Sequence, residues 1–148
     1  MARYGKIFGG PVQENMPQVY EAICDAGALP GTLVVRTSGK FVQANAASKG
    51  RLFIVQENYL ALKDVDTAWP AGARIIGMDL LDEQIFRGRV PTATSITQDT
   101  PLSANAAGKL IPATTGTFVV AFANETYNNT SGSDQLVSIR AGKGYAFA

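Results

Sequence analysis

The chain has 148 residues, enough for one domain with a single hydrophobic core. Its 13 basic and 12 acidic residues nearly balance, so it lacks the concentrated positive charge that nucleic-acid binding needs. Histidine is absent and Cys24 is the one cysteine, which excludes an intrachain disulfide and leaves few preferred ligands for a transition metal. No apolar run reaches membrane-spanning length, and the N-terminal residues lack a signal-peptide core. We therefore expect no metal or other cofactor, no nucleic-acid partner and no membrane partner.

Residues 1–15 have the character of an N-terminal arm. Four glycine and proline residues interrupt any regular element in this segment. It also carries three large apolar side chains, Tyr4, Ile7 and Phe8, which must dock on something if the segment is ordered. They can pack under the protein's own sheet or on a neighbouring molecule, and we predict that the arm is an interface element.

Residues 16–26 fit either a helix or a strand. Their apolar residues recur at helical spacing, and a preceding asparagine is placed to cap a helix. In a strand, Val19 and Ile23 share one face while Tyr20 and Cys24 share the other, and periodicity does not decide over so short a run. In the strand reading, Cys24 is expected to be a small buried apolar residue and not a reactive thiol.

Short strands and turns follow. A proline–glycine pair suits a type II turn at residues 29–31. Residues 32–36 and 40–44 are predicted strands of a hairpin with a three-residue connection at 37–39. Residues 51–57 form a predicted strand with two apolar faces, and a polar connection leads on from residue 63.

Two further strands are predicted at residues 74–80 and 84–90. On the second, Ile85, Arg87 and Arg89 share a face that we expect to meet water or an acidic partner.

The last third of the chain also consists of short strands and turns. Residues 101–123 read as strand, turn, strand, turn, strand, and the final strand at 117–123 is apolar on both faces, as a buried core strand is. Residues 124–134 form a polar loop. Residues 135–141 alternate, with Val137, Ile139 and Ala141 predicted inward and the even-numbered side chains outward.

Eight to ten short strands without a long helix indicate an all-β fold. We predict a jelly roll or a small β-barrel or sandwich, with an extended N-terminal arm at residues 1–15 and a single β domain at residues 16–148.

Carboxylates near one another are the remaining catalytic candidates. Asp64 with Asp66, and Asp79 with Asp82 and Glu83, lie in or beside turns, where acidic residues serve turn chemistry. General acid–base catalysis needs a carboxyl in a cleft with an orienting partner, and no histidine is present to supply one. We therefore expect no catalytic residues and no enzyme activity.

The turn and strand order carries a family resemblance. A turn of small residues, then Gly108-Lys109-Leu110, a glycine-bounded turn and a strand ending in Ala123-Asn124-Glu125 resemble the C-terminal half of tailed-bacteriophage head decoration proteins, also called capsid cement proteins. Residues 26–34, AGALPGTLV, are similar to the family's Pro-Gly turn that opens a strand. The likeness covers most of residues 16–142.

The resemblance implies a jelly roll or small barrel and favours a strand at residues 16–26. It implies a structural virion protein that binds the outer surface of the phage head, where it bridges and stabilises major capsid protein subunits as a homodimer or homotrimer. The protein would be present in the host cytoplasm during assembly. The apolar arm and the loop around Trp69 depart from the shared pattern.

Large apolar and cationic side chains on loose ends or exposed faces are the expected interface residues. They are Tyr4, Ile7, Phe8, Trp69, Arg87, Arg89, Tyr145 and Phe147. The alternatives are another structural virion β domain, such as a tail-tube or head-fibre component, or a carbohydrate-binding jelly roll.

Overall fold

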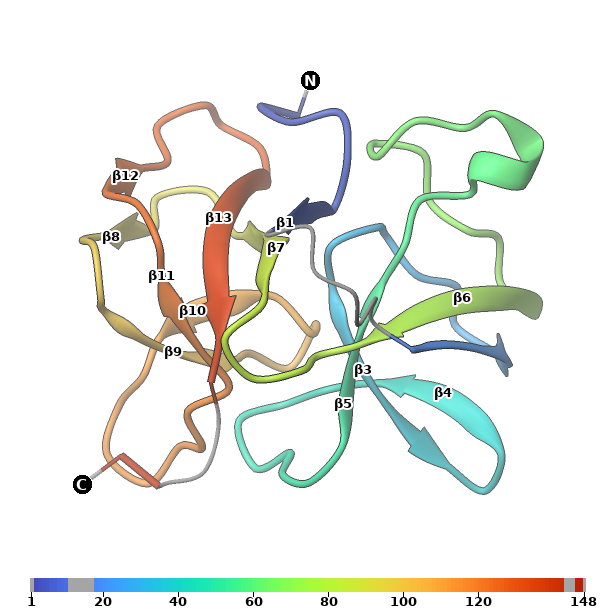
Figure 1. Cartoon of the computed structure of the whole chain (residues 1–148), viewed down its shortest axis with the longest axis horizontal. Coiled ribbons are helices and arrows are strands. Elements are labelled where there is room, and N and C mark those ends of the chain that lie inside the picture. The colour runs from blue at the N-terminus through green and yellow to red at the C-terminus, as the bar shows by residue number, and fades with distance from the viewer. Residues whose placement is uncertain (1, 11–17, 143–145, 148) are drawn as a thin grey trace.

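The computed structural model describes residues 2–10, 18–142 and 146–147. Strand accounts for 44% and helix for 2%, which confirms the predicted all-β class. The strands form two curled antiparallel sheets that pack together as a sandwich, with a small two-stranded ribbon at one end (Figure 1).

The five-stranded sheet is built from the first half of the chain. Its order is β2 (Val19–Cys24), β6 (Ala73–Asp79), β5 (Leu52–Val55), β3 (Leu33–Thr37) and β4 (Lys40–Gln43). The six-stranded sheet takes β1 (Phe8–Gly10) from the N-terminus and the rest from the second half. Its order is β1, β7 (Ile85–Val90), β13 (Gln135–Ala141), β11 (Ala121–Ala123), β9 (Pro101–Ala104) and β10 (Leu110–Pro112). The ribbon pairs β8 (Ser95–Ile96) with β12 (Tyr127–Asn128), and one 3-10 turn, η1 (Tyr59–Ala61), precedes the loop to β6.

The strand interpretation of residues 16–26 is confirmed where they are described, from residue 18. Val19 and Ile23 of β2 point outward and are exposed, while Cys24 is buried. The Cys24 thiol donates to the carbonyl oxygen of Gly27 at 3.2 Å, and burial raises its pKa. Cys24 is therefore a buried structural residue, as expected.

A small core fills the curl of the five-stranded sheet, whose edge strands β2 and β4 contact each other. The rings of Phe41 and Phe53 meet edge to face with centroids 5.3 Å apart. A Cβ at Gly77 would lie 2.9 Å from the tip of Phe41, so a glycine is needed there. Trp69 closes one end, because its backbone pairs with Ala28 and its indole N–H donates to the Gln56 carbonyl at 2.8 Å.

A larger core lies between the two sheets and within the curl of the six-stranded one. Both sheets contribute to it, with Leu33, Leu52, Ile54 and Met78 from one and Phe86, Leu102, Leu110, Leu136, Val137 and Ile139 from the other. The prediction that the even-numbered residues of β13 face outward is wrong for Leu136 and Ser138, which are buried. Leu136 packs where the turn at Gly31 meets the sheet, since a Cβ on that glycine would approach Leu136 Cδ2 to 2.6 Å.

Two element boundaries also differ from the prediction. The hairpin connection of β3 and β4 has two residues, Ser38 and Gly39, both with positive φ, because Thr37 and Lys40 still pair. Such a turn matches the twist of the flanking strands. Of the strand expected at residues 117–123, only Ala121 to Ala123 pair as a strand, β11.

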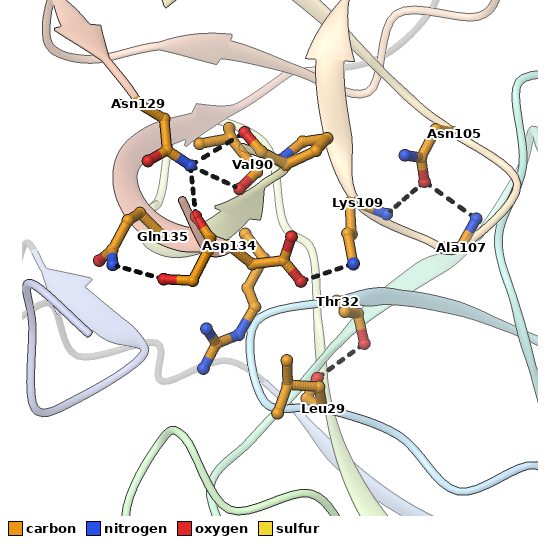
Figure 2. Close-up of polar contacts among 12 residues, drawn as sticks. Leu29, Thr32, Val90, Asn105, Ala107, Lys109, Asn129, Asp134 and Gln135 are labelled. Carbon is orange, nitrogen blue, oxygen red and sulfur yellow. Dashed lines mark hydrogen bonds and ion pairs between the residues drawn. The ribbon is translucent and has the colours of Figure 1, made fainter. Parts of the chain in front are cut away.

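Polar side chains fix the loops where the two halves meet (Figure 2). The buried Asn129 amide donates to the carbonyl oxygens of Pro91 and Ser133 at 2.9 and 2.8 Å. Lys109 pairs with Asp134 at 2.5 Å and so joins the turn before β10 to the loop before β13. The amide of Leu33 donates to the Gly108 carbonyl at 2.7 Å, which attaches that turn to the start of β3.

The N-terminal segment docks on its own domain where it is described, so the prediction that residues 1–15 form an arm on a neighbour is wrong for residues 2–10. Residues 1 and 11–15 lie outside the described residues. Strand β1 pairs with β7, and the Arg87 amide donates to the Ile7 carbonyl. The Ile7 side chain is 0% exposed within the shared core, and the rings of Phe8 and Phe86 lie 5.8 Å apart. The β domain therefore includes residues 2–10.

We predict that Ile7→Ala destabilises the protein by about 2–5 kcal/mol, because it opens a cavity in the shared core. Urea denaturation followed by far-ultraviolet circular dichroism measures this change. Lys6→Ala, at the exposed neighbouring position, is the control and should change stability by less than about 0.5 kcal/mol. Equal stability of the Ile7 variant and the wild type would contradict the burial of this side chain.

Candidate functional site

The predicted interface residues separate into three groups in the structure. Tyr4 and Phe8 lie along β7 beside Arg87, while Trp69 and Arg89 are buried. Phe147 is half-buried at the C-terminal end, where its backbone N–H and carbonyl bond to Thr117 and Gly116 at 2.8 Å each. Tyr145 lies outside the described residues.

Tyr4 and Arg87 belong to a brace that holds the N-terminal segment on the sheet. The Arg87 guanidinium carbon lies 4.2 Å from the Tyr4 ring centroid, and its Nη1 donates to Ser138 Oγ at 2.7 Å. The Tyr4 hydroxyl and the Ser138 amide donate to the Glu125 carboxylate, at 3.1 and 2.7 Å. Burial, followed by the Glu125 charge and hydrogen bond, raises the pKa of Tyr4 above its ordinary value of 10.0. These contacts are all internal, so they explain order at the N-terminus and not binding to another molecule.

The prediction that Arg89 lies on a solvent-exposed face is wrong, because its side chain is only 2% exposed. Its Nε donates to the Pro30 carbonyl at 2.8 Å, and its Nη2 donates to the Val65 carbonyl and to Asp66 Oδ1. The fork of guanidinium donors explains how a charge is buried here: several acceptors from separate loops converge on it.

The contacts of Arg89 with Pro30, Val65 and Asp66 form a junction between the two halves of the chain. Asp66 also connects this junction to the N-terminal segment. Its other carboxylate oxygen accepts from the Ala2 amide at 2.5 Å. Burial by itself would raise the pKa of Asp66, but the hydrogen bonds from Arg89 and Ala2 and the nearby positive charges outweigh it and lower the pKa below 3.8.

Two of the other candidate carboxylates, Asp64 and Asp79, have structural partners. Asp64 accepts from the Asp66 amide at 3.1 Å and from the Thr67 hydroxyl at 2.8 Å, as a turn residue does. Asp79 is buried and pairs with Arg51 at 2.8 Å. Within the described ranges, no three His, Cys, Asp or Glu side chains gather as they would around a metal ion.

Among the described residues, the two most exposed large apolar side chains lie at the turn around η1, which we call the apolar turn and define as residues 59–62. Leu62 is 94% exposed, Leu60 is 71% exposed and Tyr59 is 49% exposed. In Figure 1 the apolar turn projects from the end of the molecule where β5 leads toward β6. Large apolar groups gathered at one projecting turn are typical of an interaction surface.

The backbone of the apolar turn is fixed by local hydrogen bonds. The Asn58 side chain accepts from the Ala61 amide at 3.2 Å, and the Leu62 amide donates to the Tyr59 carbonyl at 3.1 Å. Leu62 itself has φ 54° and ψ 35°, a left-handed conformation that costs a leucine roughly 1–2 kcal/mol. The capped turn therefore holds two leucines toward solvent in a defined arrangement.

A hollow of about 480 Å³ lies beside the apolar turn. Its lining residues are Lys6, Phe8, Gln56, Glu57 and Tyr59. The hollow thus lies between Phe8, which is one of the predicted interface residues, and the apolar turn, which the sequence analysis did not predict as an interface. The signal was present as two leucines and a tyrosine within four residues, but such a run is equally common in a core.

We predict that Arg89→Leu destabilises the protein by about 3–5 kcal/mol, because the Asp66 charge and two carbonyl groups lose their donor. Arg89→Lys should restore little of this, since one ammonium does not reproduce the fork. Urea denaturation of both variants measures the change. Arg74→Leu, at an exposed arginine, is the matched control and should stay close to the wild type.

We predict that Asp66→Asn reduces the loss of stability in acid. The folded pKa of Asp66 is lowered, so its contribution is fully present above the unfolded value of about 3.9 and is lost as the pH falls through the folded value. Between about pH 5 and pH 2, the wild type should therefore lose more stability than the variant. Urea midpoints at a series of pH values measure this, and parallel profiles would count against the ion pair.

Family models and curated proteins were compared with the chain. No protein-family model matches the chain, and no curated protein matches it. In the part of the chain that the structure describes, no helix is long and apolar enough to cross a membrane. The case for a function therefore depends on the geometry above and on the resemblance in the sequence.

Proposed function

We propose that the protein is a structural virion protein, a head decoration or capsid cement protein of a tailed bacteriophage. It binds the outer surface of the phage head, and bridges and stabilises major capsid protein subunits. The observation that carries the proposal is the apolar turn, in which Leu60 and Leu62 project from a rigid β scaffold. The resemblance of residues 26–34 and of the stretch after residue 101 supports the capsid as the partner.

The physical properties of the apolar turn suit docking. Burying a leucine side chain is worth about 1.5–3 kcal/mol, and a turn that is already ordered loses little conformational entropy on binding. A single such contact gives modest affinity. A homodimer or homotrimer presents two or three of these turns, and each further contact gains effective concentration.

The buried position of Trp69 argues against the carbohydrate-binding alternative. That function needs an exposed aromatic platform, and Trp69, the one tryptophan of the chain, is buried with its indole N–H bonded to the Gln56 carbonyl. The tail-tube and head-fibre alternative remains distinguishable, because such a protein assembles into rings or filaments without heads.

We predict that the double variant Leu60→Ser/Leu62→Ser binds expanded empty heads of its phage at least about ten-fold more weakly than the wild type, while its melting temperature changes little. Co-sedimentation with purified heads measures the binding. Val42→Ser is the matched control, since Val42 is an exposed apolar residue on β4, away from the apolar turn.

Two outcomes would reject the proposal. One is equal binding by the wild type and the double variant. The other is no binding to heads together with rings or filaments of the protein alone in electron micrographs, which would favour the tail-tube or head-fibre alternative.

A further inference from the structure

Two hollows meet at Lys49, in the loop between β4 and β5. In Figure 1 this loop lies at the lower edge of the molecule, away from the apolar turn at the upper right. The first hollow has a volume of about 430 Å³ and is lined by Ser48, Lys49, Gly50, Leu52, Phe118, Val119 and Val120. The second has a volume of about 370 Å³ and is lined by Val35, Arg36, Gly39, Lys49, Arg51 and Phe53.

The first hollow is apolar and its walls are held in place. Leu52 and Val120 belong to the shared core, so they form a fixed base. The Phe118 amide donates to the Ala46 carbonyl at 3.1 Å, which ties the segment before β11 to the loop between β4 and β5. Lys49 Nζ lies 5.4 Å from the Phe118 ring centroid, at the boundary with the second hollow. A volume of this size accepts one large apolar side chain with room to spare.

The second hollow is cationic. Arg51 has its charge balanced by the buried Asp79 at 2.8 Å. Arg36 and Lys49, by contrast, form no ion pair with any residue that the structure describes, and their charged groups lie over the rings of Tyr20 and Phe118. No acidic residue lines either hollow. Two unbalanced positive charges therefore adjoin an apolar cavity.

We propose that this paired site binds an acidic segment of a partner protein that carries a large apolar side chain next to its carboxylates. The apolar side chain enters the hollow at Phe118, and the carboxylates pair with Lys49 and Arg36. Charge complementarity selects an acidic partner, because only an anion balances both cations. The apolar hollow selects a side chain that a purely acidic segment lacks. The proposal concerns a surface separate from the apolar turn and does not depend on the function proposed above.

A labelled peptide provides the probe: acetyl-Gly-Glu-Glu-Phe-Glu-Glu-Gly, followed by fluorescence anisotropy at low ionic strength against the full chain. Two comparison peptides replace either the phenylalanine by alanine or the four glutamates by glutamine. We expect the parent peptide to bind and each comparison peptide to bind at least about ten-fold more weakly, a difference of about 1.4 kcal/mol. Added salt should weaken the parent peptide as surface charges are screened.

Protein variants test the location. Lys49→Glu should weaken binding at least about ten-fold, and Arg36→Gln should weaken it by a smaller factor. Lys63→Glu is the control, because Lys63 is an exposed lysine beside the apolar turn and carries the same charge change. Since Lys49 is exposed, its variant should keep the wild-type melting temperature, and circular dichroism checks this.

Several results would overturn the proposal. They are no binding of the parent peptide at millimolar concentration, equal binding of the alanine peptide, or equal weakening by Lys49→Glu and Lys63→Glu. Displacement of the peptide by micromolar decanoate would indicate a free aliphatic carboxylate as the occupant. Self-association that Lys49→Glu abolishes, measured by sedimentation velocity, would indicate a second copy of the chain.

Discussion

The buried guanidinium of Arg89 is the interaction on which the assembly of the two halves depends. It lies on β7, yet its acceptors come from the turn at Pro30 and from the loop at Val65 and Asp66, which belong to the other half of the chain. Through Asp66 it also reaches the amide of Ala2. Among the residues that the structure describes, no strand pairing joins the five-stranded sheet to the six-stranded one. A buried charge with several converging acceptors fixes their relative position, because a shift of either half would leave that charge without partners.

Glycines then allow the close packing that this junction requires. At Gly31 a side chain would collide with Leu136, and at Gly108 it would collide with the backbone of Leu33. Both glycines also have positive φ. The two halves thus approach each other at turns where only a glycine satisfies both the backbone conformation and the available space.

Strands and turns were largely predictable from the sequence, because they depend on local chemistry: the apolar strand β5 and the turn at Gly31 both appear where expected. The burial of Arg89 and Trp69 was not predictable in this way. A period-2 pattern assigns an arginine to the wet face, whereas the acceptors of Arg89 come from segments distant in the sequence. The apolar turn is the opposite case, in which apolar side chains are exposed. Nothing in the local sequence indicates that its leucines project into solvent.

The docking of the N-terminal segment has a consequence for the order in which the chain is synthesised and folds. Its partners are made late: Tyr4 bonds to Glu125, 121 positions further along. Synthesis proceeds at about 5–20 residues per second, so these first residues leave the ribosome several seconds before Glu125 is added. During that interval the side chain of Ile7 has no core to enter. Residues 2–10, which are made before these partners, are therefore among the last parts of the domain to reach their native position, and the nascent chain exposes an apolar strand until β7 and β13 are complete.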